Sequence, residues 1–298
     1  MIRKQLIGYL LISLSLFSQA QSTMDGTVVT LEQKVRVHWD SLVTAPSDSQ
    51  KIRHAESMLM IVSECTVDDE VFHHPFISWK FCKLISSDDQ IRMINWNVPL
   101  SNGEHLYYGC VWYHSLSEDM YYTIPLKDMN RDPDKWDSRY FSNEEWPGAL
   151  YYEIIPVFKR NRKTTDTYTL LGWDGRDNMT NAKVLDVLKI MGDDKLRFGE
   201  NIFQTPTGLK KRLMFEYADE VSASFKFYPK KKCIVMDHLS PKNPIMLGVF
   251  ADYGPDGTYD LYQLEKGIWK LYSKIDISVF SANDNKMYRE PRRARRVN

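Results

Sequence analysis

Eleven short runs rich in aromatic and β-branched residues fill most of the chain between residues 91 and 275. Turn-forming clusters such as Ser101-Asn102-Gly103 and Gly254-Pro255-Asp256-Gly257 separate them. Such runs, bounded by Gly, Pro, Asn and Asp, are typical of β-strands. The pattern predicts a mainly β protein with an antiparallel sandwich- or barrel-like domain. The runs are Ile91–Val98, Tyr107–His114, Tyr121–Leu126, Tyr151–Phe158, Tyr168–Trp173, Lys183–Ile190, Leu213–Tyr217, Ala223–Tyr228, Cys233–Asp237, Tyr259–Leu264 and Ile268–Tyr272.

Two stretches of this region fit the strand pattern less well. The apolar residues of Lys183–Ile190 also recur at a helical spacing. The polar stretch from Lys127 to Gly148 is expected to form an excursion over the surface. A propeller-like fold is the alternative architecture, because Trp136-Asp137 and Trp173-Asp174 lie 37 residues apart, near the blade period of about 40.

A helical part is expected before the strands. Its first apolar stripe is formed by Leu31, Val35, Trp39 and Leu42, which share one helix face. A second helix is predicted from Ile52, Ala55, Leu59 and Val62, and a weaker third segment surrounds Phe76, Trp79 and Lys83. The expected organisation is a helical part over residues 21–90, a β domain over 91–280 and a basic tail over 281–298.

The first twenty residues have the three parts of a secretory signal peptide. Arg3 and Lys4 precede an apolar run from Leu6 to Phe17, and Ser18-Gln19-Ala20 offers a small-x-small cleavage site. The run is shorter than the about 20 apolar residues that span a bilayer. We therefore expect cleavage near Ala20 and an exported, soluble protein, periplasmic or secreted, whose mature chain has no transmembrane segment.

The formal net charge of zero hides two regions of opposite sign. The whole chain holds 39 basic and 39 acidic residues. Without Arg3, Lys4 and the six basic residues and one acid of residues 286–298, residues 21–285 hold 31 basic and 38 acidic residues. This acidic body argues against specific nucleic-acid binding, and the basic tail is expected to be disordered.

The four cysteines are Cys65, Cys82, Cys110 and Cys233. An even number in an exported chain permits disulfides, and four cysteines allow three complete pairings. Four buried free thiols are the alternative, because free cysteine is among the most buried residue types. The sequence has no CxxC motif, so zinc and thioredoxin-like sites are not indicated.

Five motifs occur in order in the second half of the chain: LLGWDG from Leu170, VLDVL from Val184, FEY from Phe215, VMDHLSP from Val235 and YGPDGTYD from Tyr253. Over roughly residues 90–275 this set resembles a group of exported Bacteroidota proteins that have no assigned activity. The resemblance implies export, and it implies no cofactor and no catalytic residue.

The familiar catalytic motifs GxSxG, HExxH, GxxxxGK[ST] and GxGxxG do not occur in the sequence. Asp237 and His238, at a strand end, are the candidates for acid–base chemistry, because histidine titrates near neutral pH. Polar and aromatic candidates for binding lie beside glycines in turn motifs. In such turns an Asp side chain can instead hydrogen-bond the nearby backbone and have no role in binding. These binding candidates are Trp173, Asp174, Asp177, Asp256 and Asp260.

Four aspartates of the polar stretch are candidate ligands of a hard cation such as calcium, although their spacing matches no twelve-residue calcium loop. They are Asp128, Asp132, Asp134 and Asp137. No other cofactor is predicted. Four tryptophans could stack on a glycan if they are exposed, or pack in a β core; they are Trp96, Trp112, Trp173 and Trp269.

These features favour a non-catalytic binding or structural protein of the envelope, whose partner is an envelope component or a glycan. The first alternative is a glycan or ester hydrolase that uses carboxylates and His238 near strand ends. The second alternative is a β module stabilised by calcium.

Overall fold

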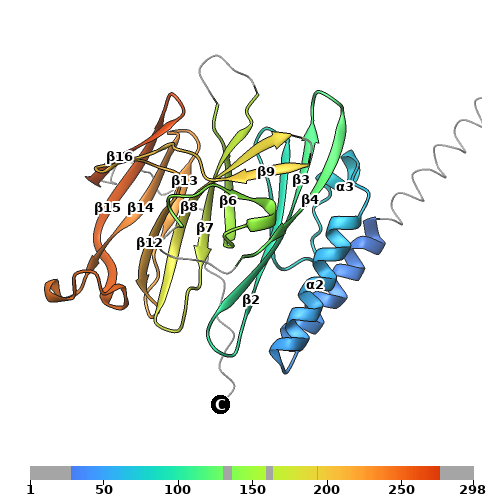
Figure 1. Ribbon diagram of the computed structural model, residues 1–298, viewed down its shortest axis with the longest axis horizontal. Helices are drawn as coiled ribbons and strands as arrows, with labels where there is room; N and C mark the ends of the chain where they lie inside the picture. Colours follow the sequence, from blue (N-terminus) through green and yellow to red (C-terminus); the bar gives the residue numbers. More distant parts are fainter. Residues whose placement is uncertain (1–27, 130–135, 159–163, 193, 276–298) are drawn as a thin grey trace, which may run out of the picture. The chain divides into compact units, whose positions relative to one another are not determined.

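The computed structural model describes residues 28–129, 136–158, 164–192 and 194–275 (Figure 1). The chain forms two compact units, Met1–Lys80 and Phe81–Asn298, and each is described by itself. The predicted signal peptide and basic tail lie outside the described residues. Within those residues, no helix is long and apolar enough to span a membrane.

The first unit is helical, as predicted. Residues 28–44 form one helix, and α2 (Asp48–Glu64) follows after a short turn. Most of their predicted apolar faces are buried, because side chains three and four residues apart lie on the same side of a helix; Trp39, Ile52 and Leu59 are half-buried. The buried residues of the two helices are Val28, Leu31, Val35, Leu42, Ala55, Met58 and Val62.

The third predicted helix is in a different place. The helix α3 (Asp69–His73) is only five residues long and ends before Pro75. Phe76 has a positive φ of 41°, which a helix does not allow, and its ring stacks on Trp79 at a centroid distance of 4.0 Å. The apolar pair Phe76 and Trp79 therefore anchors a non-helical segment instead of forming a helix stripe.

The second unit consists of three sheets. The first has the strand order β1-β2-β3-β4 and is antiparallel throughout. Because β1 begins at Cys82, the β unit starts about ten residues before the expected boundary at 90/91. Its strands are β1 (Cys82–Ile85), β2 (Ile91–Pro99), β3 (His105–Ser115) and β4 (Met120–Lys127).

The central sheet has the order β5-β9-β8-β7-β6. Its long strand β8 pairs with β7 along one edge, and along the other edge with β12 in its first half and β9 in its second half. The strands are β5 (Phe141–Ser142), β6 (Leu150–Pro156), β7 (Thr167–Asp174), β8 (Thr180–Gly192), β9 (Lys195–Phe198) and β12 (Leu213–Ala218).

The third sheet has the order β11-β10-β16-β15-β14-β13. The β10–β16 pair is parallel, and it is the one parallel pair among the named strands in the described part of an otherwise antiparallel β unit, as predicted in outline. The strands are β10 (Phe203–Thr205), β11 (Gly208–Lys210), β13 (Phe225–Tyr228), β14 (Cys233–Pro241), β15 (Tyr253–Glu265) and β16 (Ile268–Ile275).

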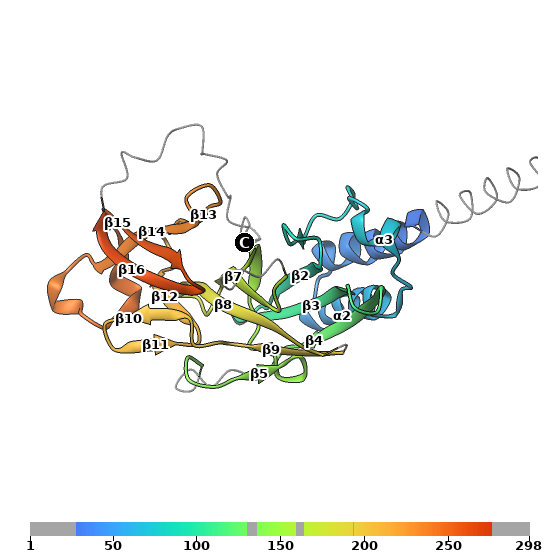
Figure 2. The same cartoon turned by 90° about the horizontal axis from the view of Figure 1, so that it is seen from above.

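The central sheet is covered on both faces. On β7 and β8, Leu170, Val184 and Leu188 belong to one apolar cluster that also holds β3 and β4 residues. Leu171 and Leu185 belong to a second cluster shared with the third sheet. Because successive strand residues point to opposite faces, β7 is buried at every position. Figure 2 shows the resulting sandwich of three open sheets, which has neither propeller blades nor a closed barrel in the described residues.

The polar stretch 127–148 is exposed at residues 137–140 and 144–145, as a surface excursion would be, but its aromatic residues anchor it in the core. Trp136, Phe141 and Trp146 are buried in the first cluster. Backbone hydrogen bonds join Trp146 to Lys127 and Met129, which fixes the stretch beside the end of β4. The few aromatic residues of the stretch therefore pack it against the first apolar cluster.

Buried polar contacts join the layers. The Asn95 side chain of β2 accepts a hydrogen bond from Tyr151 N (2.8 Å) and donates one to Tyr151 O (3.1 Å) on the edge strand β6. The Trp269 indole of β16 donates to the Thr169 hydroxyl of β7 at 2.8 Å. These contacts satisfy polar groups that would be costly to bury alone.

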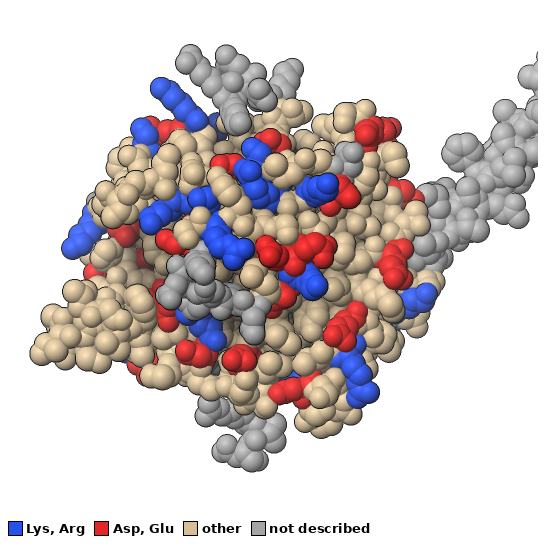
Figure 3. Space-filling model, in the orientation of Figure 1, with Lys and Arg blue, Asp and Glu red and all other residues tan. Residues whose placement is uncertain are grey.

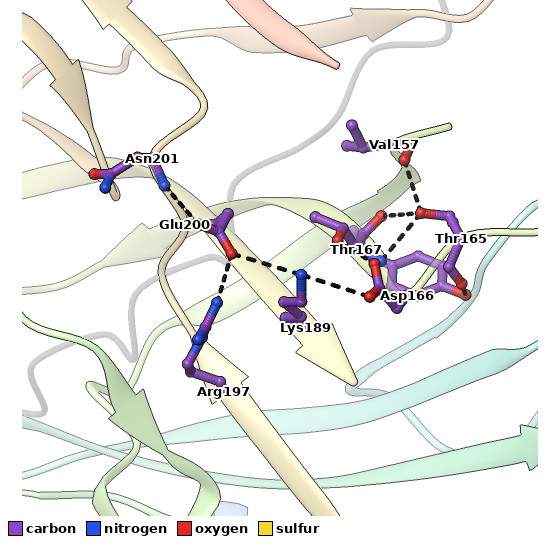
Figure 4. Close-up of polar contacts among 9 residues, drawn as sticks. Val157, Thr165, Asp166, Thr167, Lys189, Arg197, Glu200 and Asn201 are labelled. Atoms are coloured by element: carbon purple, nitrogen blue, oxygen red, sulfur yellow. Dashed lines mark hydrogen bonds and ion pairs between the residues drawn. The ribbon is translucent and has the colours of Figure 1, made fainter. Parts of the chain in front are cut away.

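An ion-pair network lies between β8 and β9 (Figure 4). Lys189 Nζ lies 3.5 Å from an Asp166 oxygen and 3.7 Å from a Glu200 oxygen. Arg197 also pairs with Glu200, at 2.5 Å. All four side chains are partly exposed, so solvent screens the network and it contributes little to the free energy of folding.

All four cysteines are free thiols. Cys82 pairs in register with Asn95, and Asn95 pairs with Gly109, the neighbour of Cys110. Two strand spacings separate Cys82 from β3, roughly 9–10 Å, beyond the reach of a disulfide. The alternative of free thiols is therefore the one that the structure contains, although only Cys110 and Cys233 are buried and Cys65 and Cys82 are partly exposed.

Candidate functional site

The β14–β15 pair contains an irregularity at the predicted acid–base position. Asp237 pairs with Tyr259, whereas Leu239 pairs with Pro255, so the residues between Pro255 and Tyr259 bulge out opposite His238. Gly257 adopts a positive φ of 86° there, a conformation that suits glycine. The bulge brings Asp256 and Asp260 to the same histidine.

His238 lies between two carboxylates. Its Nδ1 donates to Asp260 Oδ2 at 2.8 Å, and its Nε2 lies 4.0 Å from Asp256 Oδ2. Asp260 Oδ1 accepts a hydrogen bond from Lys274 N at 3.0 Å. The Asp260 contact fixes the orientation of the imidazole, and the ring keeps 27% of its side-chain surface exposed. We call these three residues the His238 cluster.

Within the His238 cluster, the surroundings of Asp256 favour its charged form. Asp256 accepts from the Thr258 hydroxyl at 2.7 Å and from Thr258 N at 2.9 Å. The hydroxyl contact chiefly lowers the pKa of Asp256, and the nearby His238 lowers it further. Asp256 thus remains a carboxylate. It lies beside His238 Nε2, in the position that a substrate would need in order to exchange a proton with the ring.

Asp237 does not belong to the cluster. Its carboxylate accepts a hydrogen bond from Ser224 N at 2.7 Å. Burial raises the pKa of Asp237, and the Ser224 hydrogen bond and the charge of Lys183 partly offset the rise. The sequence neighbours Asp237 and His238 therefore have separate partners and do not act as one pair.

The candidates around Gly175 are structural. Trp173 and Asp174 are buried. Asp174 Oδ1 accepts from the Tyr107 hydroxyl at 2.9 Å, which ties β7 to β3. Asp177 accepts from Met179 N (2.7 Å) and Thr180 N (2.8 Å), as a turn aspartate does.

Neither the glycan platform nor the calcium cluster finds support in the described residues. Trp96, Trp112, Trp173 and Trp269 are all buried. Among the described residues, no group of three or more His, Cys, Asp or Glu side chains can hold a metal ion. Of the four aspartates, Asp128 accepts from Tyr107 N and Asp137 pairs with Lys210 at 3.3 Å; Asp132 and Asp134 lie outside the described residues.

A feature that the sequence analysis passed over is the connection between β14 and β15. It contains the 3-10 helices η3 (Pro244–Met246) and η4 (Phe250–Asp252). Ile245 is 88% exposed and Leu247 78% exposed, and Val249 and Phe250 are exposed as well. We call residues 243–250 the apolar loop. The lobe at the lower left of Figure 3, where Figure 1 places this connection, shows neither basic nor acidic side chains.

Hydrogen bonds within the apolar loop and to the flanking residues Asp252 and Tyr253 brace its backbone. Asn243 Oδ1 accepts from Ile245 N (3.1 Å), and Asp252 Oδ2 accepts from Asn243 N (2.8 Å). The Tyr253 hydroxyl accepts from Gly248 N (3.0 Å), and the Tyr253 ring contacts that of Phe250 at 5.1 Å. The run from Pro244 to Phe250, with no charged residue between two turn signals, was the sequence signal for it.

Comparison with protein-family models, with curated proteins and with solved structures finds no match to this chain. The fold therefore defines the chain as a three-layer, mainly β protein with a helical N-terminal unit, and function has to be inferred from its own residues.

Proposed function

We propose that the chain is an exported, non-catalytic binding protein of the cell envelope, and that the apolar loop is its contact surface. The observation that carries the proposal is the exposure of Ile245 and Leu247 on a loop that is braced by hydrogen bonds. Burying such a side chain on a partner contributes roughly 1.5–3 kcal/mol. Contiguous exposed apolar patches often mark interaction sites.

The order of the apolar loop supports binding. A loop that is already held by Asn243, Asp252 and Tyr253 loses little conformational entropy when it docks. A flexible loop of the same composition would lose more. The hydrogen bonds that brace the loop therefore increase the affinity available from its few apolar side chains.

The charges at the base of the loop favour a protein partner with an apolar pocket. Lys242 is paired with Glu220 at 2.7 Å, and Asp252 is the next acid along the chain. Loops and helices that enter a membrane surface usually carry an excess of Lys and Arg beside their apolar residues. This base has no such excess, so a protein pocket is the better match.

Export is supported by the sequence pattern of the first twenty residues, a positive start, a short apolar run and a small-x-small site. An exported partner is consistent with that pattern. The proposed partner is accordingly an envelope protein.

Native electrophoresis of envelope extracts tests the proposal, with the chain detected by antibody. We expect the wild-type chain to migrate as a complex and the Ile245→Ser, Leu247→Ser double variant to migrate as the free chain. The matched control is Leu209→Ser, which changes an exposed leucine of the third sheet outside the loop. Equal migration of wild type and double variant contradicts the proposal.

Flotation with neutral phosphatidylcholine and phosphatidylethanolamine vesicles separates the two kinds of occupant. The purified chain is expected to stay unbound. Flotation that the double variant abolishes and Leu209→Ser does not would replace the protein partner with a bilayer.

A second candidate function rests on the 2.8 Å contact between His238 and Asp260, an oriented imidazole that is partly exposed. Such a pair can activate water for ester or glycan hydrolysis. It ranks second because Nε2 faces the Asp256 carboxylate and not a hydroxyl or thiol of the described residues. A hydrolase screen that detects activity lost in His238→Ala, but kept in Asp237→Asn, would favour it.

A further inference from the structure

The first unit brings two histidines together across its helical hairpin. His38 lies on the helix of residues 28–44 and His54 on α2. Their Nδ1 atoms are 3.2 Å apart, and the ring centroids are 5.5 Å apart with planes tilted by 48°. Both side chains are half-buried, so the two nitrogens are held by the helix packing yet lie near solvent.

The distance between the two nitrogens suits a shared metal ion. With metal–nitrogen bonds of about 2.0–2.1 Å and an angle of about 90–110° at the metal, two imidazole nitrogens lie about 2.9 to 3.4 Å apart. The observed 3.2 Å falls in this range. The hydrogen bond between the rings therefore already sets the spacing that a metal would need.

The proton that the two rings share does not prevent both nitrogens from binding a metal. A neutral imidazole is the form that binds metals. On binding, the proton between the two Nδ1 atoms moves to Nε2 of its own ring, so the neutral pair releases no net proton.

We propose that His38 and His54 form a binding site for a divalent transition metal of the Ni²⁺, Cu²⁺ or Zn²⁺ class, with the two Nδ1 atoms as protein ligands. The described residues contain no group of three candidate ligands, so water completes the coordination. Imidazole suits these metals, whereas Ca²⁺ and Mg²⁺ prefer oxygen ligands. The site is independent of the apolar loop.

Isothermal titration of the untagged full chain with Ni²⁺ tests the proposal, because Ni²⁺ does not oxidise the four thiols. We expect one equivalent to bind with an affinity that falls at least tenfold in His38→Ala and in His54→Ala. The matched control is His73→Ala, His74→Ala, two neighbouring histidines of the same unit whose side chains have other contacts. Unchanged affinity in both single variants overturns the site.

Crystals of the wild-type chain soaked in Ni²⁺ give a readout that does not depend on whether the variants fold. We expect an anomalous difference peak at about 2.1 Å from both Nδ1 atoms. A peak at one ring only, or at other histidines and not at this pair, contradicts the proposal. Addition of Ca²⁺ in the same soak is expected to leave the peak unchanged.

Discussion

Asp186 and Arg212 form a completely buried ion pair in the central sheet. Arg212 Nε donates to Asp186 Oδ1 at 3.1 Å, and the Tyr151 hydroxyl donates to Asp186 Oδ2 at 3.0 Å. Arg212 also donates to the carbonyls of Trp136 and Arg139. One guanidinium thus fastens the polar stretch, at Trp136 and Arg139, to β8.

Removal of the guanidinium is expected to be costly. Arg212→Ala leaves Asp186 buried without its cation, and breaking a buried pair in this way costs about 3–5 kcal/mol of the free energy of unfolding. Urea denaturation measures the loss. The control is Lys242→Ala, which breaks a solvent-exposed ion pair with Glu220 and is expected to leave the free energy of unfolding nearly unchanged. Equal losses would refute the structural role of Arg212.

Asp237 gives a prediction about pH. Burial raises its pKa in the folded protein, so the folded state holds this proton to a higher pH than the unfolded chain does. As pH rises from the unfolded-state pKa of Asp237 to its higher folded-state pKa, the contribution of Asp237 to the free energy of unfolding therefore falls. Asp237→Asn removes this contribution and keeps an oxygen to accept from Ser224 N.

Between pH 3.5 and pH 7, the free energy of unfolding of Asp237→Asn is expected to rise relative to that of the wild type. Denaturation at several pH values measures it. A difference that is constant, or that moves toward the wild type with rising pH, is the opposing result.

At the scale of elements, the strand pattern predicted most of the sheets because turn residues marked their ends. The ambiguity at Lys183–Ile190 had a physical cause. β8 is buried on both faces, so its apolar residues do not alternate with polar ones, and period alone cannot separate such a strand from a helix. The prediction of a helix around Phe76 was wrong for a different reason. Phe76 has a positive φ, which cannot be predicted from the residue type.

Leu185 is a direct test of the central position of β8. It is fully buried in the cluster shared with the third sheet. Leu185→Ala is expected to lower the free energy of unfolding by about 2–5 kcal/mol, because it leaves a cavity. The control on the same strand is Met191→Ala, which is exposed and expected to change it by about 0.5 kcal/mol or less. Similar values for both would place β8 at the surface.

The His238 cluster shows where sequence reasoning about a site reached its limit. Histidine and aspartates near strand ends were visible in the sequence. Their meeting depends on the β14–β15 register and on the bulge at Gly257, which shifts the pairing between Asp237 and Leu239. Because Asp237 and His238 have different partners, adjacency in sequence was the wrong guide to which residues act together.

On the scale of the whole molecule, three stacked sheets stabilise the β unit without disulfides. Cys110 and Cys233 are buried, and burial raises the pKa of the Cys82 and Cys233 thiols to about 11. The number of layers was outside the reach of the sequence, since it depends on which faces of the sheets meet.

The free thiols predict that reduction has no effect. The melting temperature of the purified chain is expected to be the same with and without dithiothreitol. A thiol reagent should modify all four cysteines in denaturant, and Cys110 and Cys233 only after unfolding. A lower melting temperature under reducing conditions would indicate a bridge and contradict the structure.

The apolar loop is the feature on which the proposed function depends, and site-specific photo-crosslinking in cells tests it most directly. A benzophenone amino acid replaces Leu247 in the loop or, as the control, Leu209 in β11; both positions are exposed. We predict one discrete crosslinked product from position 247 and none of that size from position 209. The same products from both positions, or none from position 247, would contradict the proposal that the apolar loop binds a partner.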